Sequence, residues 1–385
     1  MAVLVLSNDV VPGFGVPVAA PGLRSSGIAA GLRSHGFDVE LGVPADVLRL
    51  AGAETASPPS GSVVIELPEL MDYVESAPID VVVFTNANLT PHLRHSGEVR
   101  YVYDLFAPKM LERLASPDPE PGWDALAEQK ERALALADLV WVNGRRKLGY
   151  ALGWMMRPNV NTQRRHMGKA SIFDQDPSRR LQLVEMPVLT PGGNPVGAPA
   201  HADGRCRIGI GGYAQHWSVL DEVHPAHEAL TTAGHALHGL LPQHWSAGGS
   251  PAADSALPST TVVEHGPLML DEFHQWVQSM DVMVDVFAQS GERRLAMITR
   301  SAVALGWGVP VIHGVDSEVA DIIVEYDAGW VETSTDPVRW RTIAEEVADP
   351  TIRERKRAGA LAAQRERFDP HIALAEAALG LRALV

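Results

Sequence analysis

The chain of 385 residues contains a single cysteine, Cys206. One thiol cannot form an internal disulfide, which is typical of a protein that works in a reducing, cytoplasmic setting. No apolar run reaches the length of about 18 residues that indicates a transmembrane helix. The apolar start Ala2–Leu6 is followed at once by Asp9 and has no basic segment before it, so we expect no signal peptide.

Positive charge is also scarce. The chain has 32 Lys and Arg against 47 Asp and Glu, a formal net charge of −15. Because nucleic acids and anionic lipids attract basic surfaces, this balance argues against a nucleic-acid partner and allows at most peripheral membrane contact. The oligomeric state is left open by the sequence.

Several catalytic signatures are absent. No Gly-Lys-Ser/Thr follows a glycine-rich turn, no Gly-x-Ser-x-Gly elbow occurs, and no His-Glu-x-x-His pattern is present. Gly13, Gly15 and Gly22 are too loosely spaced for a dinucleotide fingerprint. Histidine pairs at i,i+3 spacing within 224–238 lack the further ligands that a metal site needs. We therefore expect no metal and no resident cofactor.

What is present is an alternation of apolar strands and helices. Continuous apolar runs at 2–6, 80–84, 100–103 and 139–142 predict parallel strands buried on both faces. Helices are predicted at 25–35 and 128–137 between them. A second set of strands is predicted at 207–210, 261–264, 282–287 and 309–312. This pattern predicts an α/β protein built from βαβ units.

The length and the proline-rich stretch 187–204 predict two domains. We place an N-terminal domain at 1–197, a C-terminal domain at 198–366 and a final helical segment at 367–385. Asp369 is suited to cap that segment and Pro370 to start it, and 372–384 is rich in Ala and Leu. We expect this segment to pack back on the first domain.

Two glycine-containing segments of the second half are candidates for binding phosphate. The strand at 207–210 ends in Gly211 and Gly212, where missing side chains let backbone amides approach a ligand, although a plain tight turn uses glycine in the same way. The segment Ser290–Gly314 is the stronger candidate, because a loop and the start of a helix carry arginines. Helix starts present free amides, and arginine binds phosphate oxygens bidentately, although a solvated helix face is the commoner role of a single arginine.

In the first half, Asp104 follows an apolar strand. Ligands of open α/β sheets bind beyond the carboxyl ends of strands, so Asp104 is a candidate acid there, with helix capping as the alternative. Arg24 and Asp9 lie on the loop after the first strand and are further candidates on this side.

The chain resembles retaining glycosyltransferases of the GT-B fold. The turn Gly306–Ile312 is similar to their "A-x-G-x-P-V-I" turn, and Glu292–Arg300 looks like the "E-T-R-x-x-F-R-T-R" of a subgroup common in bacterial surface-polysaccharide and natural-product clusters. Asp316–Ile323 is similar to that subgroup's "D-S-F-A-D-L-I". Matching marks continue along the chain, in order, at 9–24, 103–112, 143–154 and 176–187.

This resemblance implies two Rossmann-like domains facing a cleft, with the acceptor on the first and a nucleotide-sugar on the second. It implies that Arg300 and Arg294 stabilise the departing diphosphate, with Asp104 as a further catalytic candidate and Arg24 and Asp9 on the acceptor side. The donor-binding residues that we predict are Gly211, Gly212, Tyr213, His265, Gly266, Glu292, Arg293, Thr299 and Ser301.

The sequence departs from the wider family at two places. The acidic residue that binds the donor ribose would stand five positions before Gly308, where this chain has Val303. The Arg/Lys pair expected after the glycine-rich strand is missing, and His216 and Trp217 occur in that stretch instead.

We therefore predict a glycosyltransferase that moves a sugar from a nucleotide-diphosphate-sugar to a small-molecule, natural-product or lipid-linked acceptor. Two alternatives remain. A non-catalytic GT-B partner protein is favoured by Val303 and the missing basic pair. A sugar-nucleotide epimerase would need proton-moving groups in the cleft.

Overall fold

The computed structural model describes residues 1–116, 118–192, 205–211, 224–240, 261–263, 268–333 and 336–385, and every structural statement below concerns these. The residues form two compact units. Unit 1 contains Met1–Leu189, Leu295–Met297 and Pro370–Val385, and unit 2 contains Thr190–Arg294 and Ile298–Asp369. Each unit is described by itself.

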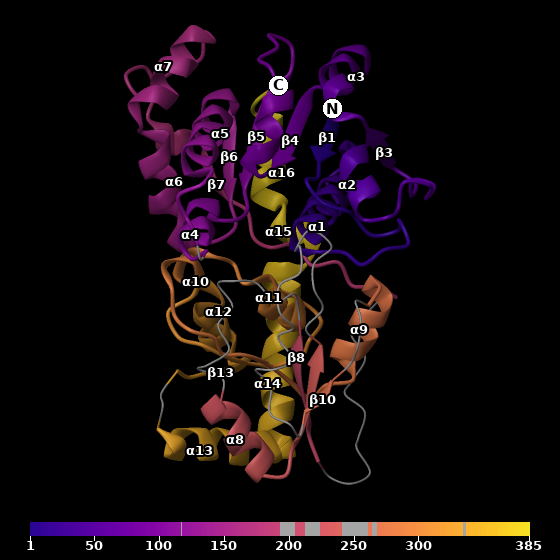
Figure 1. The fold of residues 1–385 in the computed structure, drawn as a ribbon, viewed down its shortest axis with the longest axis vertical. Helices are drawn as coiled ribbons and strands as arrows, with labels where there is room; N and C mark the ends of the chain where they lie inside the picture. The colour runs from indigo at the N-terminus through magenta and orange to yellow at the C-terminus, as the bar shows by residue number, and fades with distance from the viewer. Residues whose placement is uncertain (117, 193–204, 212–223, 241–260, 264–267, 334–335) are drawn as a thin grey trace. The chain divides into compact units, whose positions relative to one another are not determined.

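Unit 1 is built on a seven-stranded parallel sheet in the order β3-β2-β1-β4-β5-β6-β7 (Figure 1). The strands are β1 (Ala2–Leu6), β2 (Asp38–Pro44), β3 (Ser62–Ile65), β4 (Val81–Thr85), β5 (Arg100–Leu105), β6 (Leu139–Val142) and β7 (Leu181–Leu183). The helices are α1 (Ala20–Ser34), α2 (Ala45–Leu50), α3 (Leu70–Ser76), α4 (Lys109–Leu114), α5 (Trp123–Leu136), α6 (Leu148–Met155), α7 (Pro158–His166), α15 (Pro370–Ala373) and α16 (Ala375–Arg382). Short 3-10 turns are η1 (Leu67–Glu69), η2 (Ala87–His92), η3 (Arg145–Lys147) and η4 (Pro177–Arg180).

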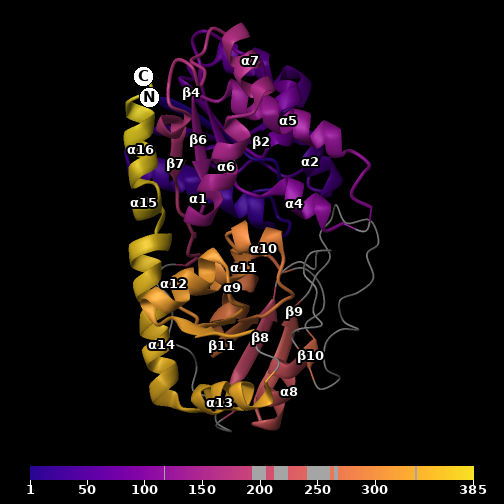
Figure 2. The ribbon, with the colours of Figure 1, turned by 90° about the vertical axis from the view of Figure 1, so that its left-hand side faces the viewer.

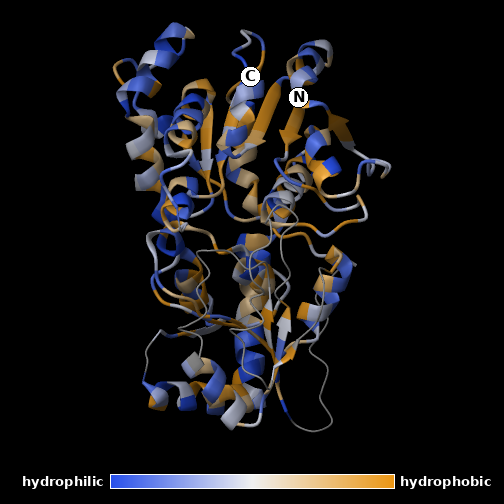
Figure 3. Ribbon diagram, viewed as in Figure 1, coloured by the Kyte–Doolittle hydropathy of each residue, from blue (hydrophilic) through white to orange (hydrophobic). Residues whose placement is uncertain are grey.

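The strand order reverses beside β1, which lies between β2 and β4. All five residues of β4 and all four of β6 are buried, as expected for strands covered by helices on both faces. Figure 3 shows these strands in the orange of apolar residues. The carboxyl ends of β4, β5 and β6, where open α/β sheets bind ligands, carry Asn86, Asp104 and Asn143, respectively.

Unit 2 contains a six-stranded parallel sheet in the order β10-β9-β8-β11-β12-β13. The strands are β8 (Arg207–Gly211), β9 (Ala236–Leu240), β10 (Val262–Val263), β11 (Val282–Asp285), β12 (Val311–His313) and β13 (Gly329–Val331). The helices are α8 (His224–Thr232), α9 (Leu270–Gln278), α10 (Gly291–Leu295), α11 (Thr299–Gly306), α12 (Glu318–Tyr326), α13 (Pro337–Ala348) and α14 (Pro350–Ala363), followed by the π-helical turn η7 (Gln364–Phe368).

These two sheets confirm the predicted α/β fold with two Rossmann-like halves. The predicted strands occur with shifted ends: β12 begins at Val311 rather than Val309, because Gly308 turns with φ 74° and Pro310 has no amide to donate. The strands β2, β3, β7, β9 and β13 were not predicted. In the part of the chain that is described, no helix combines the length and apolarity needed to span a bilayer.

The C-terminal segment packs on unit 1. Figure 2 shows α15 and α16 beside α1 and β7. Two glycines permit this contact: a Cβ on Gly31 would lie 2.4 Å from the carbonyl oxygen of Pro370, and one on Gly380 would lie 2.1 Å from Gln182. The final helix, predicted to start at Pro370, does start there, but Leu374 divides it into α15 and α16.

Replacement of Gly31 by valine is expected to weaken this contact. The new side chain would overlap Pro370 and Leu374, and overpacking of a buried contact costs about 1–3 kcal/mol. We expect faster proteolytic cleavage of the C-terminal segment, measured by limited trypsin digestion and mass spectrometry. Gly36→Ala serves as the control, because no atom lies within 4 Å of its added Cβ, although its positive φ of 83° carries a separate backbone cost. Equal cleavage of Gly31→Val and wild type would contradict the contact.

Candidate functional site

The predicted donor segment follows β11 in unit 2. It forms the short helix α10, the helix α11, the turn at Gly308 and then β12. The turn at Gly308 leads into the amino end of β12, whereas α10 and the start of α11 follow the carboxyl end of β11. In open α/β sheets this edge is where ligands bind. The Ser290 hydroxyl accepts the amide of Arg293 at 3.1 Å and thereby begins α10.

The start of α11 has the chemistry of an anion site. Its N-cap residue is Ile298, which has no side-chain acceptor for the first amides of the helix. Thr299 and Arg300 begin the helix and are partly exposed, and Ser301 follows with its side chain buried. The helix dipole favours negative charge at this end.

A buried carboxylate organises the residues around this helix start. Asp285, the last residue of β11, is 2% exposed. Its Oδ2 accepts the Ser301 hydroxyl at 2.6 Å and lies 3.4 Å from an Arg293 guanidinium nitrogen. Its Oδ1 lies 3.7 Å from Nε of Arg300. Two arginines of the predicted site therefore share one carboxylate.

The ring of Phe287 adds a second surface for the same two arginines. The guanidinium carbons of Arg293 and Arg300 lie 4.8 and 4.6 Å from its centroid. Cation–π attraction of this kind strengthens when the groups are desolvated, and Phe287 is 1% exposed. The arginines are thus held by both charge and stacking.

A histidine continues the network toward α12. The Nδ1 atom of His313 lies 3.0 Å from the Ser301 hydroxyl and 3.3 Å from Oδ2 of Asp285. Its Nε2 atom lies 2.8 Å from the hydroxyl of Ser317, which caps α12 by accepting the amide of Ala320. His313 has no exposed surface.

The pKa values of these groups follow from burial and proximity. Burial by itself would raise the pKa of Asp285, but Arg293, the hydrogen bond from His313 and Arg300 outweigh it, so its pKa lies well below the ordinary range. Burial lowers the pKa of His313 despite the neighbouring Asp285. Asp285 is therefore ionised and His313 neutral at pH 7.

The other predicted donor residues lie in different settings. Glu292 is 6% exposed, whereas the side chain of Arg294 is 64% exposed and pairs with Asp316 at 2.6 Å. Val303 is 3% exposed, so the position of the family's acidic residue is part of the apolar packing of α11. Gly211 ends β8, where a Cβ would lie 2.8 Å from the ring of Trp276. Gly212, Tyr213, His265 and Gly266 lie outside the described residues.

Three residues of this site were missed by the sequence reasoning: Asp285, His313 and Ser317. One signal was present, since Asp285 is a charged residue that ends an apolar strand. His313 and Ser317 lie 28 and 32 positions further along the chain, and only the parallel pairing of β11 with β12 brings them to Asp285.

The predicted residues of unit 1 form a second buried cluster. Arg24 and Asp104 have no exposed side-chain surface and form a bidentate pair, with distances of 3.1 Å from Nε and 2.8 Å from a terminal nitrogen. Arg24 also donates to the carbonyl oxygens of Val184 and Glu185. Arg24 lies on α1 and not on the loop predicted for it, because the helix already begins at Ala20, so the pair joins α1 to the ends of β5 and β7. Asp9 is 5% exposed and accepts the amide of Val10 at 2.7 Å.

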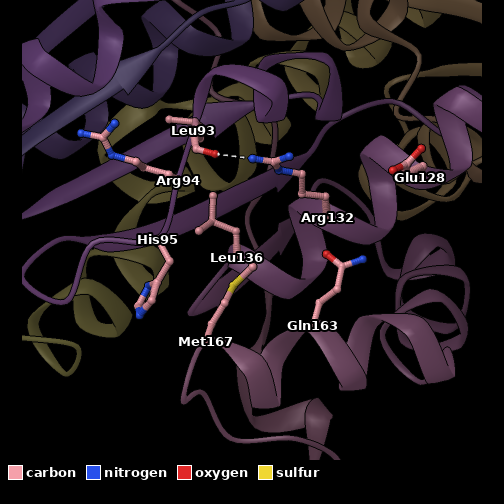
Figure 4. Close-up of a pocket in the computed structure, with 8 residues that line it drawn as sticks. All are labelled: Leu93, Arg94, His95, Glu128, Arg132, Leu136, Gln163 and Met167. Atoms are coloured by element: carbon pink, nitrogen blue, oxygen red, sulfur yellow. Dashed lines mark hydrogen bonds between the residues drawn. The ribbon is translucent and has the colours of Figure 1, made fainter.

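A pocket of about 300 Å³ lies elsewhere in unit 1 (Figure 4). Its lining includes His95, Arg132, Gln163 and Met167, and Arg132 donates to the carbonyl oxygen of Leu93 at 3.0 Å. Residues 93–95 precede β5 and Leu136 precedes β6 in the chain, which places this side of the pocket toward the amino ends of these strands, and Gln163 comes from α7. It contains none of the predicted site residues.

The histidines considered for a metal have other contacts. His235 lies 3.1 Å from the carbonyl oxygen of Ala344, and His227 is 1% exposed within α8. The described residues contain no group of three or more metal-ligating side chains.

Neither a protein-family model nor a curated protein sequence matches this chain. Solved structures do match it over its whole length. A sucrose-phosphate synthase from Thermosynechococcus elongatus has a TM-score of 0.65 at 11% identity, with 100% of this chain and 99% of that chain covered. HepE from Anabaena in complex with UDP has a TM-score of 0.58 at 13% identity, with 100% of both chains covered. WaaG, a glycosyltransferase involved in lipopolysaccharide biosynthesis, has a TM-score of 0.57 at 12% identity, with 98% of both covered.

At these identities the similarity establishes the fold. The chain has the GT-B fold of glycosyltransferases, and the match extends over both units. The predicted fold class is thereby confirmed.

Proposed function

We propose that this protein is a glycosyltransferase that takes its sugar from a nucleotide-diphosphate-sugar. The observation that carries the proposal is the start of α11, where Ile298 provides no capping side chain and Arg293 and Arg300 meet. Helix amides and guanidinium groups fixed at one point favour a diphosphate. The solved structures of this fold include HepE in complex with UDP and with UDP-glucose, which supports the same class of donor.

The chemistry follows from the charge that develops during transfer. Breaking the bond between the anomeric carbon and the diphosphate leaves negative charge on the departing oxygen. Arg300, held beside Asp285, is in our proposal the main group that stabilises it, with Arg294 as the exposed second arginine. The proposal further includes retention at the anomeric carbon, a cytoplasmic location, and a small-molecule, natural-product or lipid-linked acceptor. The proposal also places the acceptor on unit 1 and the donor on unit 2, and it includes the absence of a metal or resident cofactor.

Binding of a nucleoside diphosphate is the first expected result. UDP, GDP, ADP and dTDP are screened by thermal unfolding, because a ligand at 100 times its Kd stabilises the folded state by about 2.7 kcal/mol. One diphosphate should raise the Tm of the wild type, and Arg300→Ala should lose most of that rise. Arg339→Ala removes an arginine whose side chain is 59% exposed on α13, and should keep it. If no diphosphate shifts the Tm, the transferase proposal fails.

A turnover measurement separates the transferase from a non-catalytic protein of the same fold, an alternative favoured by the apolar Val303. A transferase supplied with its nucleotide-sugar but no acceptor hydrolyses the donor slowly, and diphosphate release is followed by chromatography. We expect release by the wild type and its loss in Arg300→Ala. Binding without release would favour the non-catalytic alternative.

A further inference from the structure

The hydrogens of the buried network around Asp285 can be assigned from its partners. The Ser317 hydroxyl accepts the amide of Ala320, so its own proton is free to be donated to Nε2 of His313. Nδ1 of His313 lies 3.3 Å from Oδ2 of Asp285, and an ionised carboxylate can only accept, so the neutral ring carries its proton on Nδ1 and accepts at Nε2. That proton is donated to the Ser301 hydroxyl or to Oδ2 of Asp285.

The same assignment fixes the orientation of the carboxylate. With Nδ1–H of His313 as donor, the Ser301 hydroxyl directs its proton to Oδ2 of Asp285, at 2.6 Å. Oδ2 is thereby the acceptor of the hydrogen-bond chain. Oδ1 has no hydrogen-bond partner among the described residues and faces Nε of Arg300. The hydrogen bonds that run from Ser317 through His313 and Ser301 thus leave Oδ1 of Asp285 facing Arg300.

The arginines need such a counter-charge. Arg293 and Arg300 lie against one ring, that of Phe287, and two guanidinium groups desolvated at one place repel each other. Asp285 lies 3.4 Å from the first and 3.7 Å from the second. Asp285 therefore offsets the repulsion between the two guanidinium groups, and the charge of Glu292 also favours the charged form of Arg300.

We infer that Asp285 is a positioning residue for the donor diphosphate: it holds Arg293 and Arg300 in the geometry that binds phosphate, and His313 fixes the carboxylate through Ser301. The inference rests on the proposed function. A positioning role and simple charge repulsion predict opposite changes in diphosphate affinity when Asp285 is removed. If Asp285 merely repelled the diphosphate through its negative charge, its removal would tighten binding. If it positions the arginines, its removal weakens binding.

The test measures the affinity of Asp285→Asn for the diphosphate that stabilises the wild type most in the screen above, beginning with UDP. We expect a loss of about tenfold by isothermal titration calorimetry, the size of one charge-assisted contact. Affinity for the matching nucleoside, uridine for UDP, is measured by saturation-transfer NMR and should stay within about twofold. A general loosening of unit 2 would lower the affinity for the diphosphate and for the nucleoside alike.

Asp281→Asn is the matched control for stability. Asp281 directly precedes β11, is 8% exposed and accepts the amide of Arg207 at 2.8 Å, so the same substitution is made at the other end of the same strand. It should lower the Tm while leaving the affinity for the diphosphate unchanged. Two substitutions of His313 give a second comparison. The variant His313→Asn keeps a nitrogen donor near the position of Nδ1 and should bind the diphosphate more tightly than His313→Leu.

The outcomes are distinct. Weaker diphosphate binding with unchanged nucleoside binding in Asp285→Asn supports the positioning role. Unchanged or tighter diphosphate binding, or parallel loss of nucleoside binding, overturns it while the proposed function stands. If the wild type binds no diphosphate, the proposed function fails and the role of Asp285 fails with it.

Discussion

Replacement of Asp104 by asparagine is expected to lower the free energy of unfolding by about 3–5 kcal/mol. The side chains of Asp104 and Arg24 have no exposed surface, so the substitution leaves a guanidinium charge buried without its counter-charge. The remaining acceptors of Arg24 are the neutral carbonyl oxygens of Val184 and Glu185. The loss is measured by urea denaturation of the whole chain.

A double-mutant cycle separates the ion pair from other roles of these residues. In the Arg24→Met background no buried charge remains to be orphaned, so Asp104→Asn should cost clearly less there than in the wild type. Glu66→Gln is the control, because it breaks the pair with Arg49, whose side chains are 52% and 46% exposed, and such pairs contribute about 0–1 kcal/mol. Additive losses in the cycle would show that the two residues act independently.

The second large effect concerns a buried lysine of unit 1. Lys130 on α5 is 2% exposed, and its Nζ atom donates to the hydroxyl of Tyr150 at 2.8 Å. The same nitrogen lies 4.3 Å from the ring centroid of Tyr150 and 5.0 Å from that of Trp154. Burial, helped by the charge of Lys147, lowers the pKa of Lys130 to about 7, although Glu112 opposes the shift.

This shift predicts a dependence of stability on pH. Between pH 7 and 10.5 the unfolded chain holds a proton on Lys130 that the folded chain has lost, so the stability that Lys130 contributes rises with pH. Relative to Lys130→Met, the wild type should gain about 1.4 kcal/mol per pH unit at the steepest point, and about 3–5 kcal/mol across the window. The measurement is urea denaturation of both proteins at pH 7, 8, 9 and 10.

The difference between the two proteins isolates Lys130 from every other group that titrates in this range. Lys109→Met provides the matched control, because it removes a lysine from the neighbouring helix α4 whose side chain is 40% exposed. A difference between wild type and Lys130→Met that stays flat from pH 7 to 10 would mean that the lysine keeps its proton in the folded state.

The fold was predictable because its signals are local. Runs such as Val81–Thr85 and Leu139–Val142 are apolar throughout, and this pattern alone predicts strands covered on both faces. The strands that were missed are short or carry polar residues, as in β7 and β9, and are defined by pairing with neighbours rather than by their own composition. Likewise the C-terminal segment was predicted as a helix from its Ala and Leu content, but its break at Leu374 was not.

The features of the candidate site also divide into those with local sequence signals and those that depend on distant residues. The amino-acid sequence alone was enough to predict the α/β class, the glycine turn before β12 and the clustering of Glu292, Arg293 and Arg300 at a helix start, because each depends on residues close together in the chain. The folded structure was needed to show that Asp285 and His313 join these arginines, and that Arg24 and Asp104, 80 residues apart, form one buried pair. Parallel pairing of strands places distant residues at one edge of a sheet, and a single sequence carries no local mark of which partners meet there.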